Sequence, residues 1–463
     1  MSRAIDAAPR SLLSRLGAID ERVAFYLLIF FGALVAGLVL ATPLAFWKYG
    51  DNAYIGMAIA TGLAALGAAT VADRAQPARA LWLIFGVAVM LRLFMLFVDP
   101  LLSSDIYRYV WDGKVQAAGI NPYRYIPADA ALASLRDTAI YPNINRAHYA
   151  VTIYPPVAQM FFFLVTRFGE NVTTMKVALL ACEGVSVTMI VLLLRQLARP
   201  ATRIVAYAWH PLPMWEIANS GHIDALMVAL MMLGLWLALT GRPLRGAASI
   251  ALAALVKPFA LLALPATWRP WDWKAPLIVI AIALLCYAPY LAVGWGVFGY
   301  LTAGYLGEEQ FGSGALLWPL AAIRWGIGAF RGDLAIYFAA SACAIAAMAL
   351  YAAWRKERSA ELCLHDINRL LLAFLFLLSP NYPWYFLILT PFVALVGGAP
   401  VWAFTLGAVL LQDELRVDPY VPVLVRKSAL YGAFLIACAY PVLRAWLNPA
   451  RSGDASDGAA ANR

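Results

Sequence analysis

Apolar runs that are long enough to cross a lipid bilayer recur along almost the whole chain, and they limit its fold more than any other feature. A transmembrane helix needs about 20 apolar residues. Of the 463 residues, 63% are hydrophobic and only 13% are charged. The runs are continuous and do not alternate in the manner of barrel strands. The sequence therefore predicts an all-α polytopic membrane protein, with about 11–14 transmembrane or re-entrant helices. Spans are expected near residues 23–43, 53–72, 80–98, 176–194, 204–218, 223–240, 275–293, 334–354, 367–380, 383–398, 400–411 and 428–447.

The basic residues are distributed as in a membrane protein. The net charge is +9, but the lysines and arginines fall largely in short loops between the apolar runs. We therefore expect a lipid bilayer and no nucleic acid as partner. The first apolar run is too long for a secretory signal peptide, so we expect it to be retained. The five cysteines form no CxxC and no cluster with histidine, and neither a disulfide framework nor a zinc site is indicated.

The loop charges also predict the topology. If the basic segment 1–22 is cytoplasmic, three spans place the long loop 99–150 on the extracytoplasmic side, and the later arginine-rich loops return to the cytoplasm. We expect a single transmembrane domain over residues 23–447 and a disordered cytoplasmic tail over residues 448–463.

This topology requires that two apolar stretches do not cross fully. Residues 152–168 begin with Pro155-Pro156, and residues 246–267 are interrupted by Lys257-Pro258. Both resemble re-entrant or broken helices, whose freed backbone groups need protein or water around them. The alternative is an ordinary proline kink and a miscounted span. A similar short element is expected within residues 314–331.

The loop 99–150 holds five acidic and five basic residues directly beside apolar segments. Asp105, Arg108, Asp112 and Gln116 recur with helical spacing, and Ser103 or Ser104 is placed to cap the start of such a helix. The helix dipole would keep the Asp105 carboxylate ionised. The alternative is an amphipathic surface helix whose charges are only solvated.

Ionisable residues within the apolar segments indicate a polar cavity. A charge in the bilayer is costly unless it is paired or hydrated. A single such residue could instead form a structural ion pair, for example Arg92 with Asp99 or Glu216, or Lys257 with Glu183 or Glu216. The residues concerned are Arg92, Glu183, Glu216, His222, Asp224 and Lys257.

Carboxylates and cations in one cavity suit transfer from a lipid-linked phosphate. An aspartate can deprotonate an incoming hydroxyl, while a lysine or arginine stabilises the charge on the leaving phosphate. Aromatic rings can pack against sugar faces, although most of them also fit an ordinary interfacial belt. These aromatic residues are Tyr107, Tyr109, Trp111, Tyr123, Tyr125, Tyr382, Trp384 and Tyr385.

Several motifs in order resemble a known family. They are SDIYRYVWDGKVQAAGINPY, IYPPV, NSGHIDAL, ALVKPFALLALP and SPNYPWYFLILTPF. Together they resemble the C-type integral-membrane glycosyltransferases, in particular the bacterial polyprenol-phosphate-mannose-dependent mannosyltransferases, and are similar in outline to the first GPI mannosyltransferase. The resemblance implies an inverting displacement at the sugar C1 and a catalytic Asp105 in the first extracytoplasmic loop. Many relatives have paired acids there, whereas this chain has Ser104-Asp105-Ile106, so we expect no metal and no cofactor.

The leading hypothesis is an integral enzyme of the bacterial inner membrane that transfers a hexose, with mannose expected, from a polyprenyl-phosphate donor to an extracytoplasmic glycan or glycolipid. Asp105 is the expected general base, with Arg108 and Asp112 orienting it. The alternatives are a lipid-linked sugar flippase or transporter, and an oligosaccharide polymerase or ligase. The expected substrate-binding residues are Arg92, Lys257, His222, Asp224, Tyr107, Tyr154, Tyr382 and Trp384.

Overall fold

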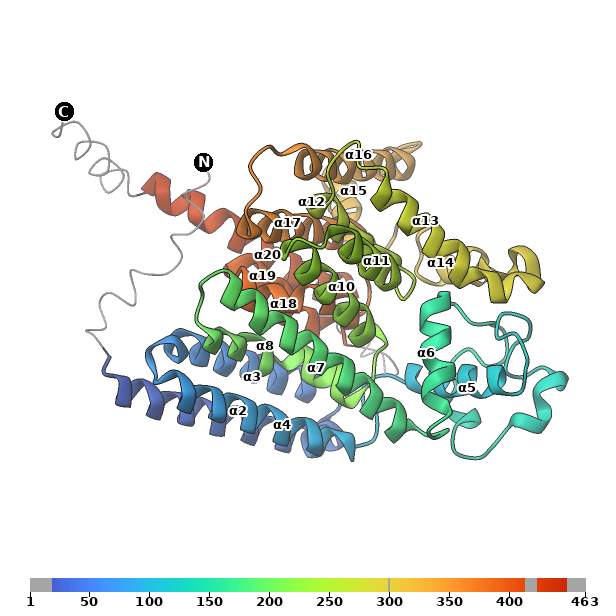
Figure 1. Ribbon diagram of the computed structural model, residues 1–463, viewed down its shortest axis with the longest axis horizontal. Coiled ribbons are helices and arrows are strands. Elements are labelled where there is room, and N and C mark those ends of the chain that lie inside the picture. Colours follow the sequence, from blue (N-terminus) through green and yellow to red (C-terminus); the bar gives the residue numbers. More distant parts are fainter. Residues whose placement is uncertain (1–18, 299, 413–422, 448–463) are drawn as a thin grey trace.

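The computed structural model describes residues 19–298, 300–412 and 423–447, and in these ranges the regular secondary structure is helical (Figure 1). Seven of the described helical segments are long and apolar enough to cross a membrane. The predicted fold class, an all-α polytopic membrane protein, is confirmed. The proposed tail 448–463 and most of the segment 1–22 lie outside the described residues. The seven segments are Glu21–Tyr49, Asp51–Arg74, Pro77–Leu96, Val172–Gln196, Lys274–Phe298, Asp333–Trp354 and Val423–Pro441.

The first three spans form a tightly packed unit. Helices α2 (Glu21–Tyr49) and α3 (Asp51–Val71) meet at Gly50, whose φ of +73° belongs to the left-handed region that favours glycine. Small residues in α3 let the two helices approach closely, because a Cβ on Gly67 would lie 2.6 Å from the Phe31 ring. Helix α4 (Pro77–Leu96) follows and leads directly into the loop 99–150.

That loop contains the predicted helix, α5 (Asp105–Ala117), which packs against the short helix α6 (Pro156–Thr166). The contact is close, since a Cβ on Gly113 would lie 2.4 Å from the Phe162 carbonyl oxygen. Figure 1 shows α5 and α6 together at the right-hand end of the molecule. The expectation that the stretch after Pro155 does not cross fully agrees with the 11 residues of α6.

The central region contains one error of the sequence prediction. The expected span at residues 204–218 consists instead of short pieces: α8 (Val205–Ala208), α9 (Pro211–Pro213) and the π-helix η6 (Met214–Asn219). The prolines of α9 lack the amide hydrogen that a continuous helix requires, so an apolar stretch of the right length does not become one regular span. The surrounding helices are the 3-10 helix η5 (Ala201–Ile204), α7 (Val172–Gln196) and α10 (Asp224–Leu239).

The break expected at Lys257-Pro258 is confirmed. Helix α11 (Pro243–Ala254) ends before it, and the 3-10 helix η7 (Pro258–Ala263) and α12 (Leu264–Thr267) follow. Lys257 itself is extended, with φ −144° and ψ 125°, which is the conformation that a following proline imposes.

The C-terminal half completes the bundle. The short element expected within residues 314–331 is confirmed as α15 (Trp318–Ile327). The other elements are α13 (Lys274–Tyr287), η8 (Ala288–Phe298), η9 (Leu301–Tyr305), α14 (Leu306–Glu308), α16 (Asp333–Trp354), α17 (Ala360–Leu378), η10 (Pro383–Leu389), α18 (Thr390–Leu395), α19 (Ala399–Gly407), η11 (Ala408–Leu411) and α20 (Val423–Leu447).

Loops that the charges assign to the cytoplasm meet each other. Arg203 lies 3.1 Å from Asp73, and Arg199 forms an ion pair with Glu361. These contacts join three loops that are far apart in the sequence. Arg146 of the loop 99–150 pairs instead with Glu308 of α14, at 2.7 Å. These three loops therefore lie together, and the loop 99–150 contacts a different part of the chain.

Candidate functional site

A cavity of about 170 Å³ lies where the motifs of the sequence converge. Its walls come from the start of α5, the end of the loop 99–150, the YPP segment, the Lys257 break, η9 and η10. Segments that are up to 280 positions apart (105 and 385) thus share one polar space. The lining residues are Asp105, Arg146, Ile153, Tyr154, Pro155, Val256, Lys257, Pro258, Phe259, Leu301, Tyr305, Tyr382, Trp384 and Tyr385.

Asp105 is the first residue of α5, and its carboxylate faces the cavity. The Ser103 hydroxyl accepts a hydrogen bond from the Asp105 amide at 3.2 Å, whereas Ser104 makes no capping bond with its side chain. Asn145 donates to Oδ1 of Asp105 at 2.6 Å. The side chain is 13% exposed, so the carboxylate is held in place yet remains open to a ligand.

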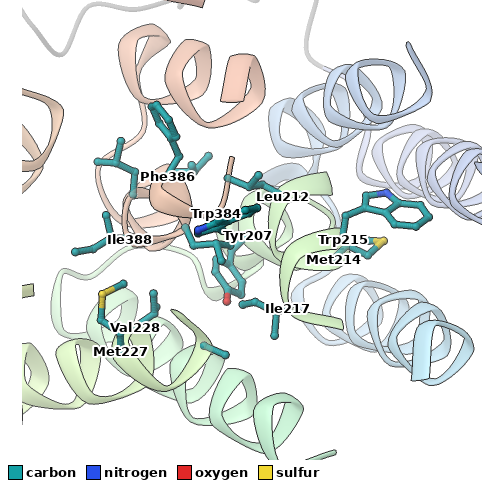
Figure 2. Close-up of a cluster of buried hydrophobic side chains, with 14 of the residues drawn as sticks. Tyr207, Leu212, Met214, Trp215, Ile217, Met227, Val228, Trp384, Phe386 and Ile388 are labelled. Carbon is teal, nitrogen blue, oxygen red and sulfur yellow. The ribbon is translucent and has the colours of Figure 1, made fainter. Parts of the chain in front are cut away.

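His222 and Trp384 lie behind Asp105. Nδ1 of His222 is 3.9 Å from Oδ2 of Asp105, and Nε2 is 3.2 Å from a carboxylate oxygen of Glu216, without hydrogen-bond geometry. The His222 ring stacks on Trp384 with the ring centres 4.2 Å apart, and Tyr382 stacks on Trp384 at 4.5 Å. Figure 2 shows Trp384 among a cluster of buried apolar side chains. The stacked rings of Tyr382 and Trp384 are therefore held in place by the hydrophobic core.

Lys257 forms an ion pair at the cavity, but not with either of the two predicted partners. Its ammonium lies 2.6 Å from Asp224, so pairing with Glu183 or Glu216 is excluded as the observed arrangement. The Asp224 side chain is fully buried, whereas that of Lys257 is 14% exposed. The ammonium also lies 5.0 Å from the centre of the Tyr385 ring. Lys257 is thus a cation that lines the cavity and is held by a carboxylate behind it.

Arg146 is a second cation of the cavity, and the sequence prediction missed it. Its Nε donates to Glu308 at 2.7 Å, and its guanidinium lies 5.6 Å from the Tyr305 ring. Burial lowers its pKa, the hydrogen bond to Glu308 and the charge of Asp105 raise it, and the net shift is upward. The residue has φ of +55°, a strained conformation for a side chain other than glycine that occurs preferentially at functional sites.

Arg92 and Tyr107 were both predicted to bind substrate, but neither lines this cavity. Arg92 forms a buried pair with Glu183 at 2.7 Å, so the suggested partners Asp99 and Glu216 are wrong. Tyr107 is half-buried and packs against the hydrophobic core.

Arg108 and Asp112 also lie apart from the cavity. They pair with each other at 2.7 Å, inside the contact between α5 and α6, where Gln159 donates to Asp112 at 2.9 Å. In the described structure neither side chain is paired with Asp105, so no direct contact supports the prediction that they orient this carboxylate. Asn145 and His222 are the residues whose side chains lie beside the Asp105 carboxylate. Of the polar face predicted for α5, only Asp105 reaches the cavity.

The arrangement combines one accessible carboxylate, two cations and a wall of aromatic rings. Such a set can accept a proton, stabilise a phosphate and bind the faces of a sugar. In the described ranges, no group of three or more histidine, cysteine, aspartate or glutamate side chains is arranged to hold a metal ion. The residues of the cavity themselves support acid–base and electrostatic chemistry.

Comparison with known proteins gives a consistent family. A family model described as "Alpha-(1->6)-mannopyranosyltransferase, N-terminal domain" matches residues 23–271. The chain is 28% identical over 227 residues to alpha-(1->6)-mannopyranosyltransferase A of Mycobacterium tuberculosis, covering 44% of this chain and 43% of that protein. It is 29% identical over 207 residues to the protein of the same name in Corynebacterium glutamicum, covering 42% and 40%.

A third relative is a probable alpha-(1->6)-mannopyranosyltransferase of Mycolicibacterium smegmatis, which is 26% identical over 199 residues, covering 41% of this chain and 34% of that protein. Each of these matches spans less than half of the curated relative. No solved structure matches the chain. The family match includes Asp105, Arg146 and Lys257, whereas the aromatic residues of η10 lie beyond it.

Proposed function

The chain belongs to the α-(1→6)-mannopyranosyltransferase family, and from this premise we propose that it transfers mannose from a polyprenyl-phosphate donor to an extracytoplasmic glycan or glycolipid. The observation that supports this most is the composition of the cavity, in which Asp105 faces Arg146 and Lys257 within about 170 Å³. A base and phosphate-binding cations in one partly enclosed space are the groups that such a transfer requires.

In the proposed reaction, Asp105 accepts the proton of the acceptor hydroxyl. The acceptor oxygen attacks C1 of the mannose, and the bond between C1 and the phosphate oxygen breaks on the opposite face. The electron pair of that bond stays on the polyprenyl phosphate, which leaves with an additional negative charge. Inversion at C1 gives an α-linked product from a β-linked donor. A separate metal ion is not required, because the cations of the chain face the leaving group.

Arg146 and Lys257 are the proposed phosphate ligands. Both line the cavity, and each is paired with a carboxylate behind it, Glu308 and Asp224 respectively. In a site with little water, a preorganised cation stabilises developing charge by several kcal/mol, in the range of about 3–4 kcal/mol for a single donor. Arg92 has no part in this proposal, since it is held by Glu183 away from the lining residues.

Aromatic side chains are the proposed sugar-binding surface. Tyr154, Tyr382, Trp384 and Tyr385 all line the cavity. The stack of Tyr382 on Trp384, with ring planes 4° apart, gives a flat apolar surface of the kind that packs against a pyranose face. Tyr305 donates to or accepts from Tyr385 at 2.7 Å and so fixes the edge of this surface.

We further propose that residues 23–447 form one transmembrane domain in a bacterial inner membrane, with the cavity on the extracytoplasmic side. The positively charged loops support this orientation, because they meet at the end of the molecule that lacks α5. A donor whose headgroup faces outward would then reach Asp105 without crossing the protein.

The test uses the purified full-length protein in lipid nanodiscs with a radiolabelled, β-linked polyprenyl-phosphate mannose and a synthetic α-mannoside acceptor. We expect a product that carries one added α-(1→6)-linked mannose, and about 100- to 10,000-fold slower formation of it by the Asp105→Asn variant. Movement of the donor across proteoliposomes without a new glycosidic bond would show a flippase. Transfer only from a lipid diphosphate oligosaccharide would show a polymerase or ligase. Either result would overturn the proposed function.

A further inference from the structure

Glu216 is a buried carboxylate that the proposed reaction does not use. It lies in the π-helix η6, and its side chain is fully buried. Neither of its carboxylate oxygens has a hydrogen-bond partner within the described part of the chain. A buried carboxylate without compensation costs several kcal/mol, and π-helices occur preferentially at functional sites. A nearby cation would stabilise the Glu216 carboxylate, and the position of Glu216 in a π-helix favours a functional explanation.

His222 is placed to be that cation. It is fully buried, its Nε2 lies 3.2 Å from Glu216 and its Nδ1 lies 3.9 Å from Asp105. Both ring nitrogens are buried without a formed hydrogen bond in the described structure, so the ring is aimed at two carboxylates at once. An imidazolium has a donor on each nitrogen and can serve both.

The backbone around His222 keeps the ring against the start of α5. Gly221 has φ of +70°, and a Cβ at this position would lie 2.3 Å from the Ile106 side chain of α5. Any other residue would therefore be strained by this φ and would displace the Ile106 side chain. On the opposite side, the Trp384 ring lies stacked on His222 at 4.2 Å and limits its rotation.

We propose that Glu216 and His222 form a positioning pair for the general base, in which the His222 imidazolium bridges the carboxylates of Glu216 and Asp105. Nε2–H donates to Glu216. Nδ1–H donates to Oδ2 of Asp105 once binding of the acceptor substrate shortens the present distance of 3.9 Å between these two atoms. Asn145 holds the other oxygen, Oδ1. The pair fixes the direction of the Asp105 carboxylate toward the acceptor hydroxyl, while the proton of that hydroxyl moves to Asp105.

This inference rests on the proposed function and revises the role expected for His222. The residue does not line the cavity, so it is a positioning residue and not a ligand of the donor phosphate. A loss of positioning lowers kcat, whereas a loss of a phosphate ligand weakens donor binding. The two roles therefore differ in a measurable way.

The test compares two conservative variants in the nanodisc transfer assay. Asparagine places its amide nitrogen near the position of Nδ1, whereas glutamine places it near that of Nε2. We expect His222→Asn to retain most of kcat, and His222→Gln to lose about 10- to 100-fold, as is typical when an outer-shell hydrogen-bond partner is removed. Glu216→Gln should also lower kcat, and the KM for the donor should stay unchanged in all three variants.

His210 provides a matched control. It is also a fully buried histidine that packs against a tryptophan, Trp402, with ring centres 5.3 Å apart, and it contacts Thr405 instead of a carboxylate. His210→Asn and His210→Gln should both lower thermal stability, and the two variants should have equal kcat. Equal kcat for His222→Asn and His222→Gln, or a raised donor KM with normal kcat, would overturn the inference while the proposed function stands.

A second measurement does not depend on activity. The chain has four histidines, so ¹⁵N-histidine labelling gives few signals, and the His222→Gln variant identifies the one of interest. We expect both nitrogens of His222 to be protonated, and the Nδ1 signal to shift in Asp105→Asn. A neutral ring, or an Nδ1 signal that Asp105→Asn leaves unchanged, would overturn the positioning role. If the wild-type protein transfers no mannose, the proposed function fails, and the spectrum alone decides whether the bridge exists.

Discussion

Replacement of Lys257 by methionine separates the structural and functional roles of the same ammonium group. The Asp224 carboxylate is fully buried, one of its oxygens has no partner in the described structure, and Lys257 contacts the other at 2.6 Å. Lys257→Met leaves this carboxylate buried without its cation, which typically costs about 3–5 kcal/mol of stability. If Lys257 also binds the donor phosphate, transfer falls by about 100- to 1,000-fold, the range for loss of one preorganised donor.

A double variant removes the ambiguity between these two effects. Lys257→Met with Asp224→Leu replaces the ion pair by apolar side chains of similar volume, which is often neutral for stability. We expect the double variant to recover the midpoint of unfolding in detergent and to remain inactive in the transfer assay. Lys257→Arg keeps a cation at the cavity and should retain part of the activity.

The control is an ion pair away from the cavity. Arg324 and Asp333 lie 2.7 Å apart at the ends of α15 and α16. Arg324→Met should lower stability without changing the specific activity of the folded protein. Recovery of normal transfer by the Lys257→Met and Asp224→Leu double variant would show that Lys257 only joins α10 to the break after α11. Unchanged stability of Lys257→Met would contradict the importance of the ion pair itself.

Three further outcomes are expected. Asp105→Asn should lower transfer by about 100- to 10,000-fold with an unchanged unfolding midpoint, and near-normal turnover of the purified variant would remove Asp105 from the mechanism. Arg146→Gln should raise the KM for polyprenyl-phosphate mannose and lower kcat, whereas an unchanged response to donor concentration would contradict phosphate binding. In a cysteine-free background, a cysteine at the exposed position Ala130 should react with a membrane-impermeant thiol reagent from outside, and labelling only from the cytoplasm would invert the topology.

The sequence was sufficient to predict most of the fold, because each apolar run carries its own signal for a buried helix. It was also sufficient to place the break at Lys257, where a following proline restricts the backbone locally. It failed at residues 204–218, where the stretch contains two prolines and a π-helix. It also failed at residues 383–398 and 400–411, where 3-10 helices replace part of each expected span. A run of apolar side chains indicates that a segment is buried, but not that its backbone is regular.

The candidate site was predictable only where a residue stands out locally. Asp105 begins a helix with a clear polar periodicity, and Trp384 lies in a dense aromatic motif. Arg146 and Asn145 were missed because they lie in an irregular polar stretch in which no spacing distinguishes one residue from another. Their roles depend on long-range contacts, such as the one between Asn145 and Asp105, which are 40 positions apart.

Four of the ionisable residues in the apolar segments lie in two settings that the sequence alone did not distinguish. Arg92 and Glu183 lie within the uninterrupted helices α4 and α7, and they neutralise each other outside the cavity. Lys257 and His222 lie instead at breaks, after α11 and after the π-helix η6. A regular helix satisfies its own backbone, so a charge on it depends on partners from neighbouring segments, as Arg92 does on Glu183 and on the Ala208 carbonyl oxygen at 2.8 Å. A break frees backbone donors and acceptors that require a polar environment, and the nearby charge shares that environment. Of these four residues, only Lys257 also lines the cavity, so a break places a charge in a polar environment but the contact with the cavity decides whether a substrate can reach it.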